Sequence, residues 1–171
     1  PLYVKAICDR NIERLKHFKN EFQIEETYSE FEKMLDNKEL DIIAVYTPDA
    51  LHCEQVIEAL KAGKHVICTK PMATSLEDAL KIFDGVKKSG KKYMTAQTAR
   101  FISQYVHMKE LLKNITPPGI FACRAQYIPD ISPYLKLTPW RLEMPQDFMY
   151  GGGLHPIDLL YWYAGSVEEV F

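Results

Sequence analysis

The run DIIAVYTPDALHCEQVIEALKAGKHVICTKPM, residues 41–72, most constrains how this chain can fold. Residues 42–46 are apolar and mostly β-branched, which is typical of a parallel strand buried on both faces. From His52 the apolar residues recur at helical spacing until Gly63, the expected left-handed end of the helix. His65 then begins a second strand. Strand, helix and strand in this order predict a β-α-β unit, and therefore an α/β fold with a parallel sheet.

Polar residues follow each predicted strand. Asp9 comes after an alternating run at residues 2–8, and Thr47-Pro48 comes after the strand at 42–46. Thr69-Lys70 ends the strand that starts at His65, and Gln97 ends a strand at 93–96. In open parallel sheets the carboxyl ends of the strands form one edge, where ligands bind. The sequence therefore predicts that these four clusters line a single binding edge.

The end of the first strand suggests a nucleotide preference. In dinucleotide-binding folds a carboxylate after the second strand accepts hydrogen bonds from the adenosine ribose and repels a 2′-phosphate, so Asp9 favours NAD over NADP. The guanidinium of Arg10 is compatible with stacking on adenine or with binding the extra phosphate, which leaves NADP open. Asp9 is also suited to capping the following helix, and both roles are compatible with each other.

A second informative run is MYGGGLHPID, residues 149–158. Its three glycines let the backbone approach a ligand closely, and Pro156 suits the first turn of a helix. His155 would then lie at a helix N-terminus, where the helix dipole disfavours the imidazolium and favours a proton-accepting imidazole. Asp158 lies three residues later on the same face. The alternative is structural, with His155 as a capping histidine and Asp158 as an acid of the first helical turn.

Composition excludes several other classes of protein. Among 171 residues the formal net charge is -2, with both signs interleaved, so we expect no nucleic-acid or membrane surface. No apolar run is long enough to span a bilayer, and the first residues already show a strand pattern without a charged leader, so we expect a cytoplasmic protein. The four cysteines have no C-x-x-C spacing, which favours reduced thiols over disulfides or metal ligands.

These motifs resemble the glucose-fructose oxidoreductase / inositol dehydrogenase / rhizopine-catabolism (Gfo/Idh/MocA) family of NAD(P)-dependent sugar and polyol dehydrogenases. The resemblance rests on Thr47-Pro48-Asp49, His52, residues 62–66, residues 70–73, Gln97, Arg100, Phe101, His155 and Asp158. The chain departs from the family pattern at Thr69, where the family has glutamate, and at Gly151, where it has aspartate. Thr98 and Ala99 also depart from it.

The resemblance implies a role for each matching residue. Lys70 and His155 would be catalytic with Asp158: His155 takes a proton and Lys70 holds the substrate oxygen. The cofactor contacts would be Asp9, Arg10, Thr47, Pro48, His52, Thr69, Lys70 and Gln97. Arg100, Trp140 and Arg141 would face a small sugar, polyol or diol substrate. A surface ion pair is an equally suitable role for Arg100.

The resemblance also implies how the chain is divided. We expect a Rossmann-like domain at residues 1–116, without the family's glycine-rich first strand-turn-helix, and the start of an α+β substrate domain at 117–171. The boundary is the run of breakers at 116–119, and a strand of a second sheet is predicted at 120–128. Since family members are much longer, we expect a part of a longer protein that forms homo-oligomers through this second sheet.

The predicted function is hydride transfer between an alcohol carbon of the substrate and NAD or NADP, with NAD favoured. An alternative is a catalytically silent, nucleotide-sensing regulator on the same scaffold. The departures at Thr69 and Gly151 motivate the alternative, whereas the presence of Lys70 and His155 favours the enzyme.

Overall fold

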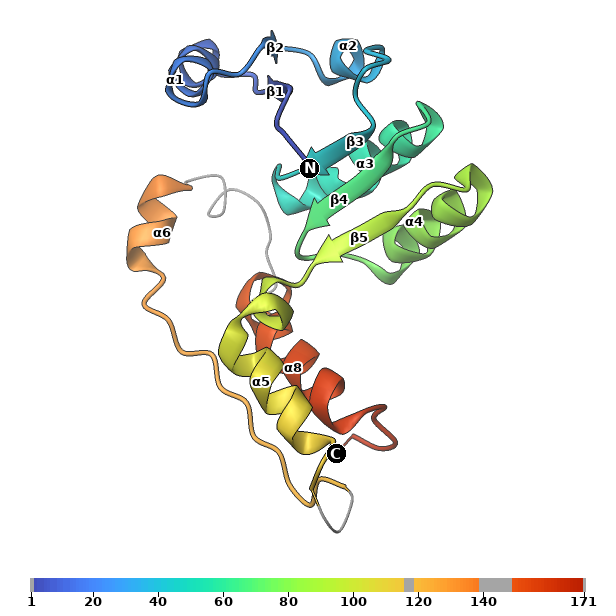
Figure 1. The fold of residues 1–171 in the computed structure, drawn as a ribbon, viewed down its shortest axis with the longest axis vertical. Helices are drawn as coiled ribbons and strands as arrows, with labels where there is room; N and C mark the ends of the chain where they lie inside the picture. Colours follow the sequence, from blue (N-terminus) through green and yellow to red (C-terminus); the bar gives the residue numbers. More distant parts are fainter. Residues whose placement is uncertain (1, 116–118, 139–148, 171) are drawn as a thin grey trace.

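The computed structural model describes residues 2–115, 119–138 and 149–170. Within these ranges the chain forms two parallel sheets with helices beside them, and a pair of helices that extends away from the sheets (Figure 1). The predicted α/β class with parallel strands is confirmed. None of the described helices is both long enough and apolar enough to cross a bilayer.

The larger sheet has three strands in the order β3, β4, β5, with bounds Ile42–Val45, His65–Thr69 and Tyr93–Ala96. Val45 pairs with Cys68, and Thr69 pairs with Ala96. All three strands therefore run in the same direction, and their carboxyl ends reach one edge. This is the arrangement that the β-α-β pattern predicts.

Helices α3 (His52–Lys61) and α4 (Leu76–Ser89) lie side by side on one face of this sheet (Figure 1). Gly63 has φ 78° after α3, so this helix ends where the sequence predicts, and the side chain of Ser75 accepts a hydrogen bond from the Asp78 N–H at the start of α4. The core between helices and sheet is built from Ile43, Val45, Val56, Ala59, Leu60, Val66, Cys68 and Ile82.

The prediction that the strand at 42–46 is buried on both faces is wrong. Ile43 and Val45 are buried, but Ala44 between them is exposed, as is Met94 on β5. Because α3 and α4 cover the same face, no described helix covers the other one. The apolar composition of residues 42–46 therefore predicted more burial than the structure shows for this strand.

The smaller sheet pairs β1 (Ala6–Cys8) with β2 (Glu26–Tyr28), joined by α1 (Ile12–Phe22). The sequence predicts a strand from residue 2, but Leu2, Tyr3 and Val4 are exposed and lie outside β1. After β2, helix α2 spans Phe31–Leu35 and has no side-chain cap. β1 and β3 belong to separate sheets and are not hydrogen-bonded to each other.

The C-terminal part of the described chain is helical. Helices α5 (Ser103–Leu112) and α8 (Leu154–Ala164) run side by side, and Tyr163 on α8 donates a hydrogen bond to the Tyr105 carbonyl (Figure 1). The remaining elements are the 3-10 turns η1 (Asp49–Leu51) and η2 (Thr98–Phe101), the short helix α6 (Ser132–Leu137) and the π-helical turn η3 (Met149–Gly153).

The predicted strand at 120–128 is wrong, because residues 120–131 form neither helix nor strand. A strand needs a partner for its backbone hydrogen bonds, and the described residues supply none beside this segment. Oligomerisation through a sheet in this region therefore stays a prediction, as does the domain boundary near residue 116.

Candidate functional site

The carboxyl edge of the β3-β4-β5 sheet gathers the polar residues that the sequence singles out. Thr47, Lys70 and Gln97 each follow one of three neighbouring strands, and the strand register brings these ends together. Asp9 follows β1 in the other sheet. Three of the four predicted polar clusters thus lie at the carboxyl edge of one sheet, and the fourth, at Asp9, belongs to the other sheet.

Lys70 is joined to the second informative run. Its Nζ donates a hydrogen bond to the carbonyl of Gly151, in the π-helical turn η3 that leads into α8. The resembled motif has an aspartate at the position of Gly151. In this chain the main-chain carbonyl of Gly151 accepts the bond from Lys70. The contact brings the end of β4 and the start of α8 together, which the sequence pattern alone did not require.

His155 lies partly buried near Lys70. Its ring contacts the ring of Tyr127, with centroids 5.0 Å apart and a tilt of 50°. Burial lowers the pKa of His155, and the positive charge of Lys70 lowers it further, while Asp158 acts in the opposite direction. A neutral imidazole, able to accept a proton, follows from these surroundings.

The direction of this shift agrees with the sequence-based expectation, but its cause differs. The helix dipole was expected to disfavour the imidazolium at a helix N-terminus. In the structure η3 continues directly into α8 with Gly153 in helical conformation, so the helical backbone begins before His155. Burial and Lys70 are the causes instead.

Arg100 and Asp158 form a bidentate ion pair. Arg100 Nε lies 2.8 Å from Asp158 Oδ2, and Arg100 Nη2 lies 2.7 Å from Asp158 Oδ1. Of the two roles considered for Arg100, this arrangement supports the ion pair, with a carboxylate on α8. The hydrogen bonds leave Asp158 and Arg100 engaged with each other, so direct substrate contact by either is not what this geometry favours. The guanidinium also lies over the Trp162 ring.

His52 does not occupy the position of a cofactor contact. It is fully buried, with Nδ1 2.7 Å from the Pro71 carbonyl oxygen and Nε2 2.9 Å from the Thr47 carbonyl oxygen. Both ring nitrogens therefore face main-chain atoms. His52 makes these internal contacts in place of the direct cofactor contact that was expected. The hydroxyl of Thr47 donates to Gln55 Oε1 over 2.6 Å.

Gln97 carries an unsatisfied polar atom. Its Oε1 is buried and has no hydrogen-bond partner among the described residues. Buried polar atoms are usually paired, so an unpaired amide oxygen at the carboxyl end of β5 is an observation that fits a bound polar group. The carboxamide of a nicotinamide offers the N–H donors that such an atom lacks, so the residues present fit this half of a dinucleotide.

Asp9 is held by its own chain. Oδ1 accepts a hydrogen bond from the Asn11 N–H at 2.9 Å, and Oδ2 lies 3.1 Å from Arg14 Nη1. The cap of α1 is Asn11, which accepts from the Arg14 N–H, so Asp9 is not the capping residue. Its carboxylate stands at the end of β1, where a ribose contact requires it. Arg10, beside it, is exposed.

Sequence reasoning missed three participants. Gln55 follows His52 by one helical turn, a spacing that a search for residues on one helix face would find. Tyr127 and the Gly151 carbonyl have no signal in the sequence, because both reach the site through tertiary packing. Trp140 and Arg141 lie outside the described residues, and their substrate role stays a prediction.

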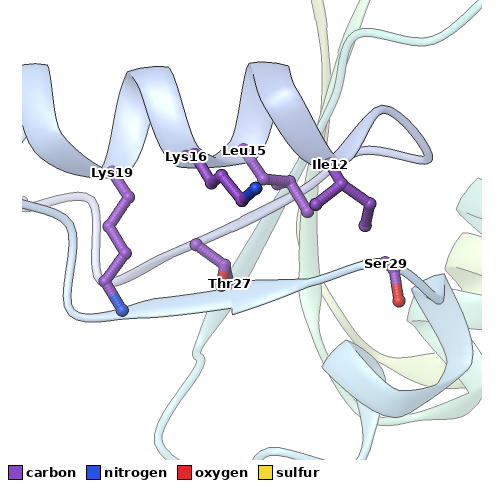
Figure 2. Close-up of a pocket in the computed structure, with 6 residues that line it drawn as sticks. All are labelled: Ile12, Leu15, Lys16, Lys19, Thr27 and Ser29. Atoms are coloured by element: carbon purple, nitrogen blue, oxygen red, sulfur yellow. The ribbon is translucent and has the colours of Figure 1, made fainter.

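A shallow pocket of about 290 Å³ lies elsewhere, between α1 and β2 (Figure 2). Lys16 and Lys19 extend from the helix over one side, and Thr27 and Ser29 come from β2 and the turn after it. None of the residues predicted for cofactor or substrate lines it. The chemistry described above therefore belongs to the edge of the larger sheet and not to this pocket.

Comparison with known proteins identifies the family of this chain. A family model described as an oxidoreductase family with an NAD-binding Rossmann fold matches residues 2–97. The myo-inositol 2-dehydrogenase of Thermotoga maritima is 30% identical over 97% of this chain and 49% of its own length. The levoglucosan dehydrogenase of Pseudarthrobacter phenanthrenivorans is 28% identical over 97% of this chain and 44% of its own length.

Solved structures give the same result. The myo-inositol 2-dehydrogenase from Lactobacillus plantarum matches with a TM-score of 0.87 and 25% identity, over 96% of this chain and 49% of its own. A levoglucosan dehydrogenase in complex with NADH and levoglucosan matches with a TM-score of 0.80 and 28% identity, over 94% of this chain and 44% of its own. The chain thus spans about half the length of the relatives that it matches. From the matched residues and these relatives, the chain belongs to the Gfo/Idh/MocA family of oxidoreductases with an NAD-binding Rossmann fold.

Proposed function

We propose that this protein is an NAD-dependent oxidoreductase that transfers a hydride between nicotinamide and a secondary-alcohol carbon of a sugar, polyol or diol. The observation that carries the proposal is the convergence of Lys70 and His155. Lys70 follows β4, His155 lies on α8, and the hydrogen bond from Lys70 to Gly151 joins the two segments. A neutral imidazole can accept the hydroxyl proton, and a cationic donor beside it can stabilise the negative charge on the oxygen.

Oxidation of an alcohol removes a proton from the hydroxyl group and a hydride from its carbon. His155 takes the proton as general base, a contribution that is typically worth about 10²–10⁴-fold in rate. Its lowered pKa supports this role because the neutral ring prevails at neutral pH. NAD, when bound, supplies the hydride acceptor. In the reverse direction, protonated His155 returns the proton to the oxygen.

Lys70 holds the substrate oxygen and stabilises negative charge that develops on it as the proton leaves. An ammonium group has three N–H donors, so Lys70 can donate to a substrate oxygen while it keeps its bond to the Gly151 carbonyl. That bond aims Nζ toward the segment that carries His155. Arg100 and Asp158 support the pair by holding α8 against η2.

The cofactor contacts follow from the polar residues at the strand ends. Asp9 would accept from the adenosine ribose, which favours NAD over NADP. Thr47, Pro48 and Thr69 would line the carboxyl edge of the β3-β4-β5 sheet. Gln97 Oε1 would accept a hydrogen bond from the nicotinamide carboxamide. The family description as NAD-binding, and NADH in the solved levoglucosan dehydrogenase, support the same cofactor.

The alternative of a catalytically silent regulator gains no support from the relatives described above, since their names state dehydrogenase activities. Those names also guide the choice of substrates, because myo-inositol and levoglucosan are a cyclic polyol and an anhydrosugar. Both carry adjacent secondary hydroxyl groups. Such compounds are therefore the substrates to screen first.

A titration with NADH, followed by nicotinamide fluorescence and with NADPH beside it, tests the first half of the proposal. Turnover of myo-inositol, levoglucosan and simple diols with NAD tests the second half. We expect saturable NADH binding and turnover within this set. Binding without any turnover would favour the regulator and contradict the proposal. No binding by the folded protein would contradict both functions.

A further inference from the structure

His52 links the two turns that carry the proposed cofactor and catalytic contacts. It is the first residue of α3 and is fully buried. Nδ1 lies 2.7 Å from the carbonyl oxygen of Pro71, directly after Lys70, and Nε2 lies 2.9 Å from the carbonyl oxygen of Thr47. One ring therefore contacts the main chain at the carboxyl ends of β3 and β4.

The chemistry of these contacts has one direction. A carbonyl oxygen only accepts, so each ring nitrogen donates whenever it carries the proton. Both carbonyls belong to turns that leave the sheet, where the ladder of backbone hydrogen bonds has ended. A neutral imidazole carries one N–H, so it donates to one of the two carbonyls at a time while its other nitrogen lies against the second. The ring thereby fixes the distance between the two turns.

Gln55 strengthens one side of this link. Its Oε1 accepts from the Thr47 hydroxyl at 2.6 Å, and it follows His52 by one helical turn on the same face of α3. Thr47 is thus held at its carbonyl by His52 and at its hydroxyl by Gln55. His52 also contacts the carbonyl of Pro71 in the Lys70–Pro71 turn.

We propose that His52 is a positioning residue that couples the Thr47–Pro48 turn to the Lys70–Pro71 turn. It thereby holds Lys70 at a fixed position relative to the strand ends that would bind the cofactor. This inference rests on the proposed function for its kinetic consequence. It replaces a direct cofactor contact by a role through other residues. A displacement of about 1 Å in a reacting group can cost about 10²-fold in rate, which makes such a link matter for turnover.

Two substitutions separate the two contacts. The amide nitrogen of asparagine takes the place of Nδ1, so His52→Asn keeps a donor toward the Pro71 carbonyl and removes the ring atom that lies against the Thr47 carbonyl. The amide nitrogen of glutamine takes the place of Nε2, so His52→Gln keeps a donor toward the Thr47 carbonyl and removes the ring atom that lies against the Pro71 carbonyl. Gln55→Ala removes the second support of Thr47 and leaves both His52 contacts intact.

The two His52 variants should affect different kinetic quantities, one the NADH Kd and the other kcat. We expect His52→Asn and Gln55→Ala to raise the NADH Kd by about two- to tenfold, the value of one hydrogen bond, with kcat nearly unchanged. We expect His52→Gln to lower kcat by up to about 10²-fold with the NADH Kd nearly unchanged. A general loss of packing would lower the unfolding midpoint of both His52 variants without this crossed pattern, and would overturn the proposal.

Amide hydrogen exchange of the cofactor-free protein gives a second readout that does not depend on activity. His52→Asn should speed exchange in peptides spanning residues 46–52, and His52→Gln in peptides spanning 69–74. Equal exchange in both turns for both variants would overturn the proposed coupling. If the wild-type protein neither binds NADH nor turns over, the proposed function fails, and the exchange data alone decide whether His52 couples the turns.

Discussion

Arg100 Nε and Nη2 bind the two carboxylate oxygens of Asp158 at 2.8 and 2.7 Å, and this pair joins the end of β5 to helix α8. The exposed fractions of the two side chains are 35% and 14%, so the pair is only partly screened by solvent. It links segments far apart in the sequence. The pair thereby helps to hold α8, the helix that carries His155, against η2.

A double-mutant cycle with Arg100→Ala and Asp158→Ala should give a coupling free energy of about 1–3 kcal/mol in urea unfolding, because the two residues share two charge-assisted bonds. The matched control is the Lys113–Glu110 pair, whose side chains are 60% and 59% exposed. That pair should couple by less than about 0.5 kcal/mol. Equal coupling in the two cycles would show that the Arg100–Asp158 pair does not support α8.

Lys70→Ala should lower kcat by about 10²–10³-fold, because it removes a donor that stabilises charge on the substrate oxygen. The NADH Kd should change less than kcat, since Lys70 is one of several residues expected to contact the cofactor. Lys113→Ala, which removes a lysine on the surface just after α5, should leave kcat unchanged. Steady-state kinetics and an NADH titration check both variants. Normal turnover by Lys70→Ala would remove Lys70 from the mechanism.

The pKa of His155 should respond in opposite directions to its two charged neighbours. It should rise in Lys70→Ala, because a nearby positive charge is lost, and fall in Asp158→Asn, because a negative charge is lost. Titration of the imidazole by NMR measures both shifts without turnover. Movement of the pKa in the same direction in both variants would contradict the arrangement described here.

The same residue makes stability depend on pH. Because the pKa of His155 is lower in the folded state, the unfolded chain binds the proton first as the pH falls. The free energy of unfolding should therefore decrease between the ordinary histidine pKa and the lowered folded pKa, and this contribution should stop changing below the latter. His155→Gln should flatten that part of the profile in urea titrations. An unchanged slope would show that His155 titrates alike in both states.

Asp9→Asn should shift the cofactor preference toward NADPH. Asparagine keeps an oxygen for the Asn11 N–H but removes the charge that repels a 2′-phosphate. It also releases Arg14 from its ion pair. We expect the ratio of NADPH to NADH affinity to rise by about fivefold or more, since two unit charges about 4 Å apart interact by ~1 kcal/mol even in water. Asp84→Asn, on the surface of α4, is the control and should not change the ratio.

Local pattern predicted the strongest part of the fold. The apolar runs and the helix end at Gly63 were enough for β3, α3, β4 and β5, because capping and periodicity act within a few residues. β2 has only three residues, and the first two, Glu26 and Thr27, are polar, so apolar periodicity could not reveal this strand. The alternating residues at 120–128 form no strand, because alternation has no effect without a neighbouring strand.

The sequence by itself determined which residue types stand at the strand ends, and with them the family, the parallel sheet and the residues Lys70 and His155. Only the tertiary structure decided how these residues are used. It turned His52 inward against two carbonyls, paired Arg100 with Asp158 and brought the Gly151 carbonyl to Lys70. The physical reason is that a side chain's partner depends on which distant segments pack beside it, and neither spacing nor propensity contains that information.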